Sequence, residues 1–179
     1  MASDFRIDIK ADKVREALGK IRLSLSAEGD MTGVMKSLGR VLLTGTQLRF
    51  RSGKGPEGQA WKTSKRASEE GGKTLRDTGG LRDSISYEAT NGQVAIGTNK
   101  VYAAIHQFGG SIKHPGGTRY VVVNAVAVFV SNAFMGPASG ITKPHPIPMP
   151  ARPFLGASES DQTELLRVLQ SQYSNLWSK

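Results

Sequence analysis

Apolar side chains recur at helical spacing in three stretches of the chain, over residues 12–26, 31–50 and 158–177. The second stretch has the clearest i, i+3, i+4, i+7 stripe, with members Met31, Val34, Met35, Leu38, Val41, Leu42 and Leu48. Such stripes predict amphipathic helices that bury one face, so we expect Leu38 and Leu42 to be buried. Three glycines interrupt this helix at a spacing of six, which places them on different faces and argues against one shared packing role: Gly33, Gly39 and Gly45.

Other segments alternate apolar and polar residues, which is the period of a half-exposed strand. Residues 5–9 and 81–88 have this pattern, and Asn91-Gly92 then predicts a hairpin turn before a return strand over 93–98. Residues 120–130 are β-branched and aromatic, and are therefore strand material. Asn124-Ala125 either divides this run into two paired strands or marks an irregularity within one. Residues 102–108 predict a short helix that ends at Gly109-Gly110.

These elements predict an α+β fold in a single domain over residues 1–179, because a chain of this length supports one substantial core. We expect one antiparallel sheet, built from residues 81–98 and 119–130. Two N-terminal helices and one C-terminal helix, at 12–26, 31–50 and 158–178, would pack against it.

Two long segments lack either period. Residues 52–80 contain seven glycines and little apolar material besides Trp61 and Leu75, which predicts a long basic loop. Trp61 either anchors this loop on the domain's own core or serves as an interface anchor. Residues 136–153 contain six prolines, which predicts an extended, polyproline-like arm. We expect both segments to be mobile in an isolated protomer and to become ordered on adjacent subunits.

The net charge of +9 is unevenly distributed. Residues 40–76 contain nine Lys or Arg and three Glu, and residues 89–158 contain no acidic residue. This imbalance favours contact with an acidic surface, either nucleic acid phosphate or an acidic protein. The alternative is that these cations are ordinary solvated side chains.

Residues that could carry chemistry are sparse. The chain has no cysteine, and its three histidines, His106, His114 and His145, lack the spacing of metal ligands on a helix. No nucleophile elbow, phosphate loop or carboxylate pair is evident. We therefore expect neither an enzyme nor a bound cofactor or metal. No run approaches the roughly 18 apolar residues of a membrane span, and the N-terminus does not have the pattern of a secretory signal.

Four motifs follow one another in order along the chain. They are Asp77-Thr78-Gly79-Gly80-Leu81-Arg82-Asp83-Ser84-Ile85, the hairpin that ends at Gly97-Thr98, Tyr102-Ala103-Ala104-Ile105-His106-Gln107-Phe108-Gly109, and Ala151-Arg152-Pro153-Phe154-Leu155-Gly156. This ordered set resembles the phage virion morphogenesis (tail completion) family over about residues 30–175. Two departures are the region 132–148, which is longer than the family pattern, and the second glycine before Leu81.

The resemblance implies a structural virion protein that completes the tail and joins it to the head by assembly. It further implies a hexameric ring in contact with neck, tail-terminator or tail-tube proteins, made in the host cytoplasm and located in the virion. The motif residues, which we expect to be mainly structural, are Asp77, Thr78, Gly79, Leu81, Tyr102, His106, Gln107, Gly109, Arg152, Pro153 and Phe154. The residues that we expect at interfaces are Trp61, Lys62, Arg66, Ile147 and Met149. The main rival is a basic nucleic-acid-binding protein that contacts DNA in the neck or during packaging, with Trp61 available to stack on a base.

Overall fold

The computed structural model describes residues 11–24, 29–131, 133 and 135–177, so the predicted strand at residues 5–9 lies outside the described residues. The helices are α1 (Asp12–Ser24), α2 (Thr32–Ser52), α3 (Lys65–Glu69), α4 (Gly80–Asp83), α5 (Ala103–Phe108) and α6 (Glu159–Trp177). The strands are β1 (Ser86–Ala89), β2 (Val94–Gly97), β3 (Gly110–His114), β4 (Arg119–Val123), β5 (Val126–Phe129), β6 (Gly140–Ile141) and β7 (His145–Met149). Helices and antiparallel strands together confirm the α+β class.

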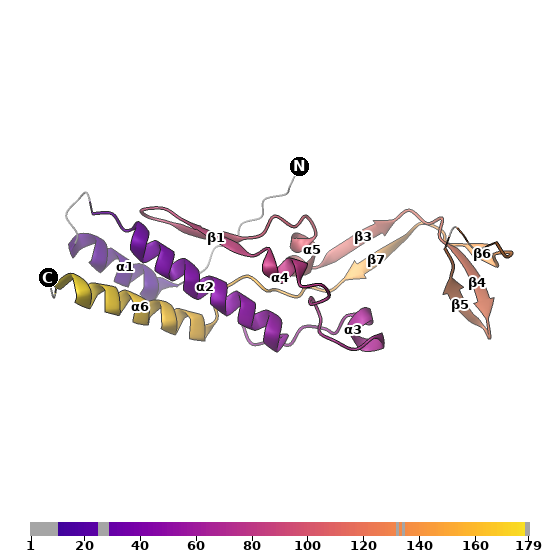
Figure 1. Ribbon diagram of the computed structural model, residues 1–179, viewed down its shortest axis with the longest axis horizontal. Coiled ribbons are helices and arrows are strands. Elements are labelled where there is room, and N and C mark those ends of the chain that lie inside the picture. The colour runs from indigo at the N-terminus through magenta and orange to yellow at the C-terminus, as the bar shows by residue number, and fades with distance from the viewer. Residues whose placement is uncertain (1–10, 25–28, 132, 134, 178–179) are drawn as a thin grey trace.

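The three long helices form a layer at one end of an elongated molecule (Figure 1). Their apolar stripes face one another, and α1 and α2 both pack against α6. Leu38 and Leu42 are buried in this core, with exposed fractions of 2% and 7%, which confirms the prediction made from the stripe. The second helix ends where Gly53 adopts a left-handed φ of 70°, a conformation that glycine enters without a steric penalty.

The predicted hairpin lies on α2, where β1 pairs antiparallel with β2 around the Asn91-Gly92 turn. The Asn91 side-chain oxygen accepts a hydrogen bond of 2.7 Å from the backbone N–H of Met31, which ties the turn to the start of α2. Tyr87 on β1 packs against Gly39, where an added Cβ would overlap the aromatic ring. A glycine is therefore required at position 39 for the hairpin to approach the helix.

The predicted strand over residues 81–88 is wrong in its first half. Residues 80–83 form the short helix α4, preceded by Gly79 at φ 86°, and β1 begins only at Ser86. Leu81 and Ile85 are both buried in a second core beside α4. Their separation of four residues fits a helical turn as well as it fits strand alternation, and this ambiguity explains the error.

The second core is built on three aromatic rings at the end of α2. Phe50 lies 5.5 Å, between ring centroids, from both Trp61 and Phe154. The Trp61 indole N–H donates a 2.9 Å hydrogen bond to the carbonyl oxygen of Pro153. Of the two interpretations of Trp61, the structure therefore shows the anchor on the protomer's own core, and residues 52–80 are attached to the body through it.

A β-ribbon arm, residues 110–149, extends from the body (Figure 1). Its shaft consists of β3 and β7, paired antiparallel with Ile112 opposite Ile147. Residues His145–Met149 of the Pro-rich segment are thus extended as predicted, but they form a paired strand, which corrects the polyproline-like prediction there. Pro146 and Pro148 occupy alternate positions of β7, so their missing N–H groups face the outer edge and not β3.

The far end of the arm, the tip, is a separate three-stranded sheet in the order β5-β4-β6. Asn124 and Ala125 form a two-residue turn between β4 and β5, with φ of 50° and 63°, so the run over 120–130 is two paired strands. The prediction that residues 119–130 join the hairpin in one sheet is wrong. The shaft separates the tip from β1 and β2, and that separation depends on long-range pairing of β3 with β7.

Candidate functional site

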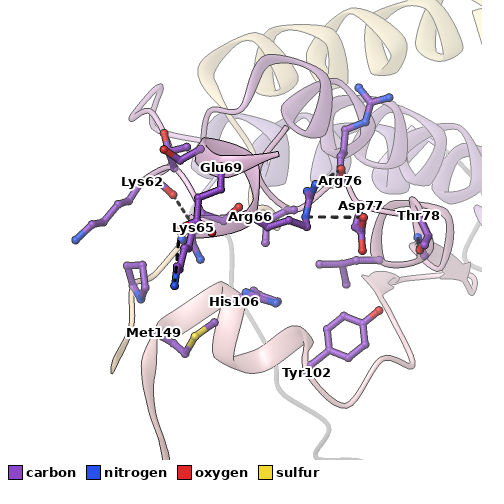
Figure 2. Close-up of a pocket in the computed structure, with 18 of the residues that line it drawn as sticks. Lys62, Lys65, Arg66, Glu69, Arg76, Asp77, Thr78, Tyr102, His106 and Met149 are labelled. Atoms are coloured by element: carbon purple, nitrogen blue, oxygen red, sulfur yellow. Dashed lines mark hydrogen bonds and ion pairs between the residues drawn. The ribbon is translucent and has the colours of Figure 1, made fainter. Parts of the chain in front are cut away.

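A groove of about 860 Å³ lies where the arm leaves the body (Figure 2). One wall is the loop that contains α3, the floor includes α4 and α5, and the end of β7 closes the other side. The apolar part of the lining includes Leu75, Leu81, Ile147 and Met149. The groove therefore combines a partly apolar surface with the polar side chains of a glycine-rich loop.

The charged lining of the groove is mainly basic. Lys65 lies 3.8 Å from Glu69, and Arg66 lies 3.8 Å from Asp77, so the two acidic side chains of the lining are already paired. Lys62 and Arg76 line the groove as well, and among the described residues neither forms an ion pair. The groove thus presents a surplus of positive charge to a ligand or partner.

His106 is the titratable group of the floor. It is half-buried on α5, its Nδ1 lacks a hydrogen-bond partner in the described part of the chain, and its ring meets Tyr102 edge-on at 6.0 Å. Burial, reinforced by the charge of Arg152, lowers the pKa of His106 from the ordinary 6.5. A neutral imidazole without a carboxylate or nucleophile bonded to it is poorly equipped for acid–base catalysis.

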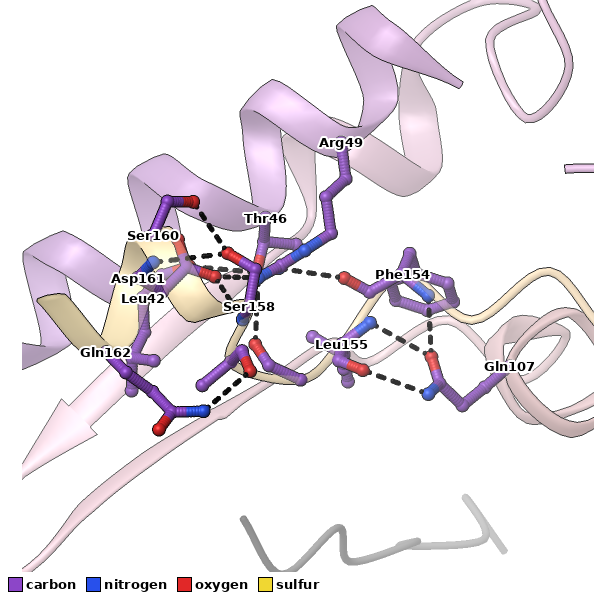
Figure 3. Close-up of polar contacts among 12 residues, drawn as sticks. Leu42, Thr46, Arg49, Gln107, Phe154, Leu155, Ser158, Ser160, Asp161 and Gln162 are labelled. Atoms are coloured by element: carbon purple, nitrogen blue, oxygen red, sulfur yellow. Dashed lines mark hydrogen bonds and ion pairs between the residues drawn. The ribbon is translucent and has the colours of Figure 1, made fainter. Parts of the chain in front are cut away.

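The motif residues behind the groove hold chain segments together. The Arg152 guanidinium donates a 2.7 Å hydrogen bond to the Lys62 carbonyl oxygen. Burial lowers the pKa of Arg152. The Gln107 side-chain oxygen accepts from the N–H groups of Phe154 and Leu155, both at 3.0 Å, and its amide nitrogen donates to the Leu155 carbonyl at 3.1 Å (Figure 3). These contacts fix the exit segment, residues 151–156, against α5.

A buried ion pair joins the ends of α2 and α6 (Figure 3). Arg49 donates to the Asp161 carboxylate, to the Phe154 carbonyl at 3.2 Å and to the Gly156 carbonyl at 3.0 Å. Burial lowers the pKa of Arg49, and the nearby Asp161 partly opposes that shift. The same carboxylate accepts from the Ser158 N–H at 2.8 Å while Ser158 Oγ accepts from the Asp161 N–H at 3.1 Å, which is a capping box at the start of α6.

The groove brings together most of the residues that the sequence singled out. Four of the five interface candidates line it: Lys62, Arg66, Ile147 and Met149. Seven motif residues line it as well: Asp77, Thr78, Gly79, Leu81, Tyr102, His106 and Arg152. Trp61 does not, because its side chain is in the core, and the remaining motif residues, Gln107, Gly109, Pro153 and Phe154, lie outside the lining.

Sequence reasoning missed the apolar tip of the arm. Large apolar side chains there are exposed by between 46% and 63%: Val122, Val123, Val126, Val128, Phe129 and Ile141. The sequence does indicate this feature, because residues 120–130 contain no charged side chain on either face of the predicted strand. That pattern is typical of a strand covered on both faces, and the described residues of the protomer leave the tip uncovered.

Within the described residues, no group of three or more His, Cys, Asp or Glu is placed to hold a metal ion. None of the helices over those residues is long and apolar enough to cross a membrane. The features that remain are surfaces: the basic groove and the apolar tip.

Comparisons with known proteins agree with the motif resemblance. The chain is 28% identical over 170 residues to "Mu-like prophage FluMu G protein 2" of Haemophilus influenzae. The aligned region covers 95% of this chain and 98% of that protein. No solved structure matches the chain. A sequence model described as the phage virion morphogenesis family matches residues 9–174, which is most of the chain. The chain belongs to the phage virion morphogenesis family.

Proposed function

We propose that this protein is a structural subunit that completes the phage tail and joins it to the head, acting by assembly and not by catalysis. Membership of the family supports a role in virion morphogenesis. The observation that carries the finer proposal is the arm, which holds an exposed apolar sheet away from the body. Apolar patches of this kind mark protein–protein contacts, and an assembly protein needs such contacts on several sides.

A ring is the arrangement that this proposal favours. Heterologous contacts between identical subunits generate closed rings when the rotation closes. Six-fold symmetry is what the resemblance to tail-completion proteins implies. Each protomer offers two separate surfaces to neighbours, the tip and the groove at the base of the arm. Neck, tail-terminator or tail-tube proteins would meet the ring above and below.

Labelling of purified virions tests the proposal. Virions would be incubated with gold-tagged antibody against this chain and imaged by electron microscopy. We expect gold at the head–tail junction or the adjoining end of the tail. Label confined to the head shell or the tail fibres, or a chain that is absent from complete virions, would contradict the proposal.

The basic groove supports a second candidate, non-specific contact with DNA that passes through the neck. Neither Lys62 nor Arg76 forms an ion pair among the described residues, and Tyr102, which lines the same groove, is 44% exposed. Phosphate contacts make such binding fall steeply with salt. Retention of the protein on random-sequence DNA at 50 mM salt and its release by 200 mM would favour this candidate. No retention at 50 mM salt would reject it.

A further inference from the structure

The tip sheet is apolar on both of its faces. Residues opposite each other in an antiparallel pair share a face, and successive residues alternate between faces. The register pairs Val121 with Val128 and Val123 with Val126, and it places Arg119 opposite Ile141 on the same side. We call the side formed by the four valines and Ile141, with Arg119 at its end, the valine face.

The opposite side is formed by Tyr120, Val122, Ala127 and Phe129, and we call it the aromatic face. Both faces are open to solvent in the protomer. Val123 and Val126 on the valine face are 52% and 62% exposed, and Val122 and Phe129 on the aromatic face are 52% and 63% exposed. Antiparallel sheets in isolated domains commonly have one apolar and one solvated face, so this sheet departs from the usual pattern.

The position of the tip makes its own body an unsuitable cover. Figure 1 shows the full length of the β3–β7 shaft between the tip and the helical layer. The tip is also well formed without a cover. Val122 donates its N–H to Ser139 Oγ at 2.9 Å, and Ser139 donates its own N–H to the Tyr120 carbonyl at 2.8 Å. A well-formed sheet with two uncovered apolar faces is shaped to be placed between two other surfaces.

We propose that the tip sheets of neighbouring copies stack head to tail, with the valine face of one copy on the aromatic face of the next. This inference rests on the proposed ring function and names its contact. Two different faces on one element give a heterologous contact, and such contacts build a ring when the rotation between neighbouring copies closes. A two-fold dimer of tips would cover one kind of face and leave the other exposed on both copies.

Charge favours a second copy over an acidic partner. Residues 120–130 carry no charge, and Arg119, at the end of β4 on the valine side, donates to the Gly136 carbonyl at 3.2 Å, so two tips stacked over the valines bury no carboxylate between them. An acidic partner would meet Arg119 and Lys143 at the rim of the sheet but would bring carboxylates against valine and phenylalanine side chains. A stack of tips is therefore expected to persist as salt rises, whereas an acidic partner would be released.

Disulfide cross-linking reads the orientation directly, because the chain has no native cysteine. Val122→Cys places a thiol on the aromatic face, and Val123→Cys places one on the valine face. Both proteins would be purified at full length, checked for unchanged circular dichroism and thermal unfolding, and oxidised with copper phenanthroline at 50 mM and 500 mM salt. Ser171→Cys on the exposed side of α6 provides a control for random collisions.

Head-to-tail stacking predicts that a mixture of the Val122→Cys and Val123→Cys proteins forms dimers at least tenfold faster than either protein alone. The mixture should also exceed any mixture with Ser171→Cys, at both salt concentrations. Faster dimer formation by a single variant than by the mixture would indicate a two-fold contact. Dimer formation at the same rate as in the Ser171→Cys control would indicate no contact between tips. Either result overturns the inference, and gold label at the tail of virions would then leave the proposed function standing.

Discussion

Arg49 on α2 and Asp161 on α6 form an ion pair in which both residues are buried, with exposed fractions of 5% and 7%. The pair connects the long helix to the capping box of the last helix and to the carbonyl groups of the exit segment. An added Cβ at Gly45 would overlap the Asp161 carboxylate, so the glycine in α2 makes space for the pair. Helix packing, helix capping and the exit segment therefore depend on one contact.

Removing one partner of this pair leaves a buried charge uncompensated. We expect Arg49→Met to lower the free energy of unfolding by about 3–5 kcal/mol. Urea denaturation followed by circular dichroism measures the change. Arg51→Met, which alters an exposed arginine on the same helix, is the matched control and should stay within about 0.5 kcal/mol of wild type. Similar losses in the two variants would show that the ion pair is not the cause.

The glycines of α2 should respond in opposite directions to the same substitution. Gly39→Ala would drive a methyl group into the Tyr87 ring, and we expect it to cost about 1–3 kcal/mol. Gly33 has no neighbouring atom within 4 Å of an added Cβ, so Gly33→Ala should stabilise the helix by up to about 1 kcal/mol. Thermal unfolding of the two variants checks the sign. Destabilisation by both substitutions would contradict the account of close approach at Gly39.

His106 should make the stability depend on pH. Because burial lowers its pKa in the folded state, the unfolded chain binds more protons between the folded value and about 6.5. We therefore expect the free energy of unfolding of wild type to decrease as the pH falls below about 6.5. The contribution of His106 to this decrease should level off below the pKa that His106 has in the folded state. Urea denaturation of wild type and His106→Gln between pH 7.5 and 4.5 tests this. The variant should lose less stability, and parallel curves would exclude the histidine as a cause.

The turn at the tip contains a residue that is poorly suited to its backbone conformation. Ala125 has φ of 63°, a left-handed value that costs a residue with a Cβ roughly 1–2 kcal/mol. Ala125→Gly would create the Asn-Gly pair that two-residue hairpins favour, and hydrogen exchange of the β4 and β5 amides should slow. Asn124→Ala should have the opposite effect, since asparagine tolerates this conformation better than alanine. Unchanged exchange in both variants would contradict the assignment of the turn.

Local patterns predicted the body of the protein better than the arm. The stripe through Leu38 and Leu42 and the Asn91-Gly92 turn are short-range signals, and the structure places both as expected. The shaft depends on pairing between strands that are more than 30 residues apart along the chain, which no local period encodes. Prolines at every second position of 144–150 are nevertheless compatible with an edge strand, although their density alone indicates a polyproline-like arm.

The site shows the same division between local and long-range information. The ordered motifs identified the family and predicted seven of the residues that line the groove, because each motif is a short local pattern. The Arg49–Asp161 pair joins positions 112 residues apart, which no local pattern indicates. The Ser158–Asp161 spacing indicates only the capping interaction between these two residues. The exposed apolar faces of the tip do not follow from the expectation that residues 120–130 lie in a sheet covered by helices, because that expectation gives both faces a cover.

Virion assembly in cells tests the central claim most directly. A phage encoding Val128→Lys, which places a charge on the valine face of the tip, would be compared with one encoding Val101→Lys, the same substitution at a 74% exposed position on the body. If the protein acts through the tip of its arm, the Val128→Lys chain should fold normally, yet the yield of complete, tailed virions should fall at least tenfold relative to Val101→Lys. Equal yields of complete virions from the two phages would contradict the account.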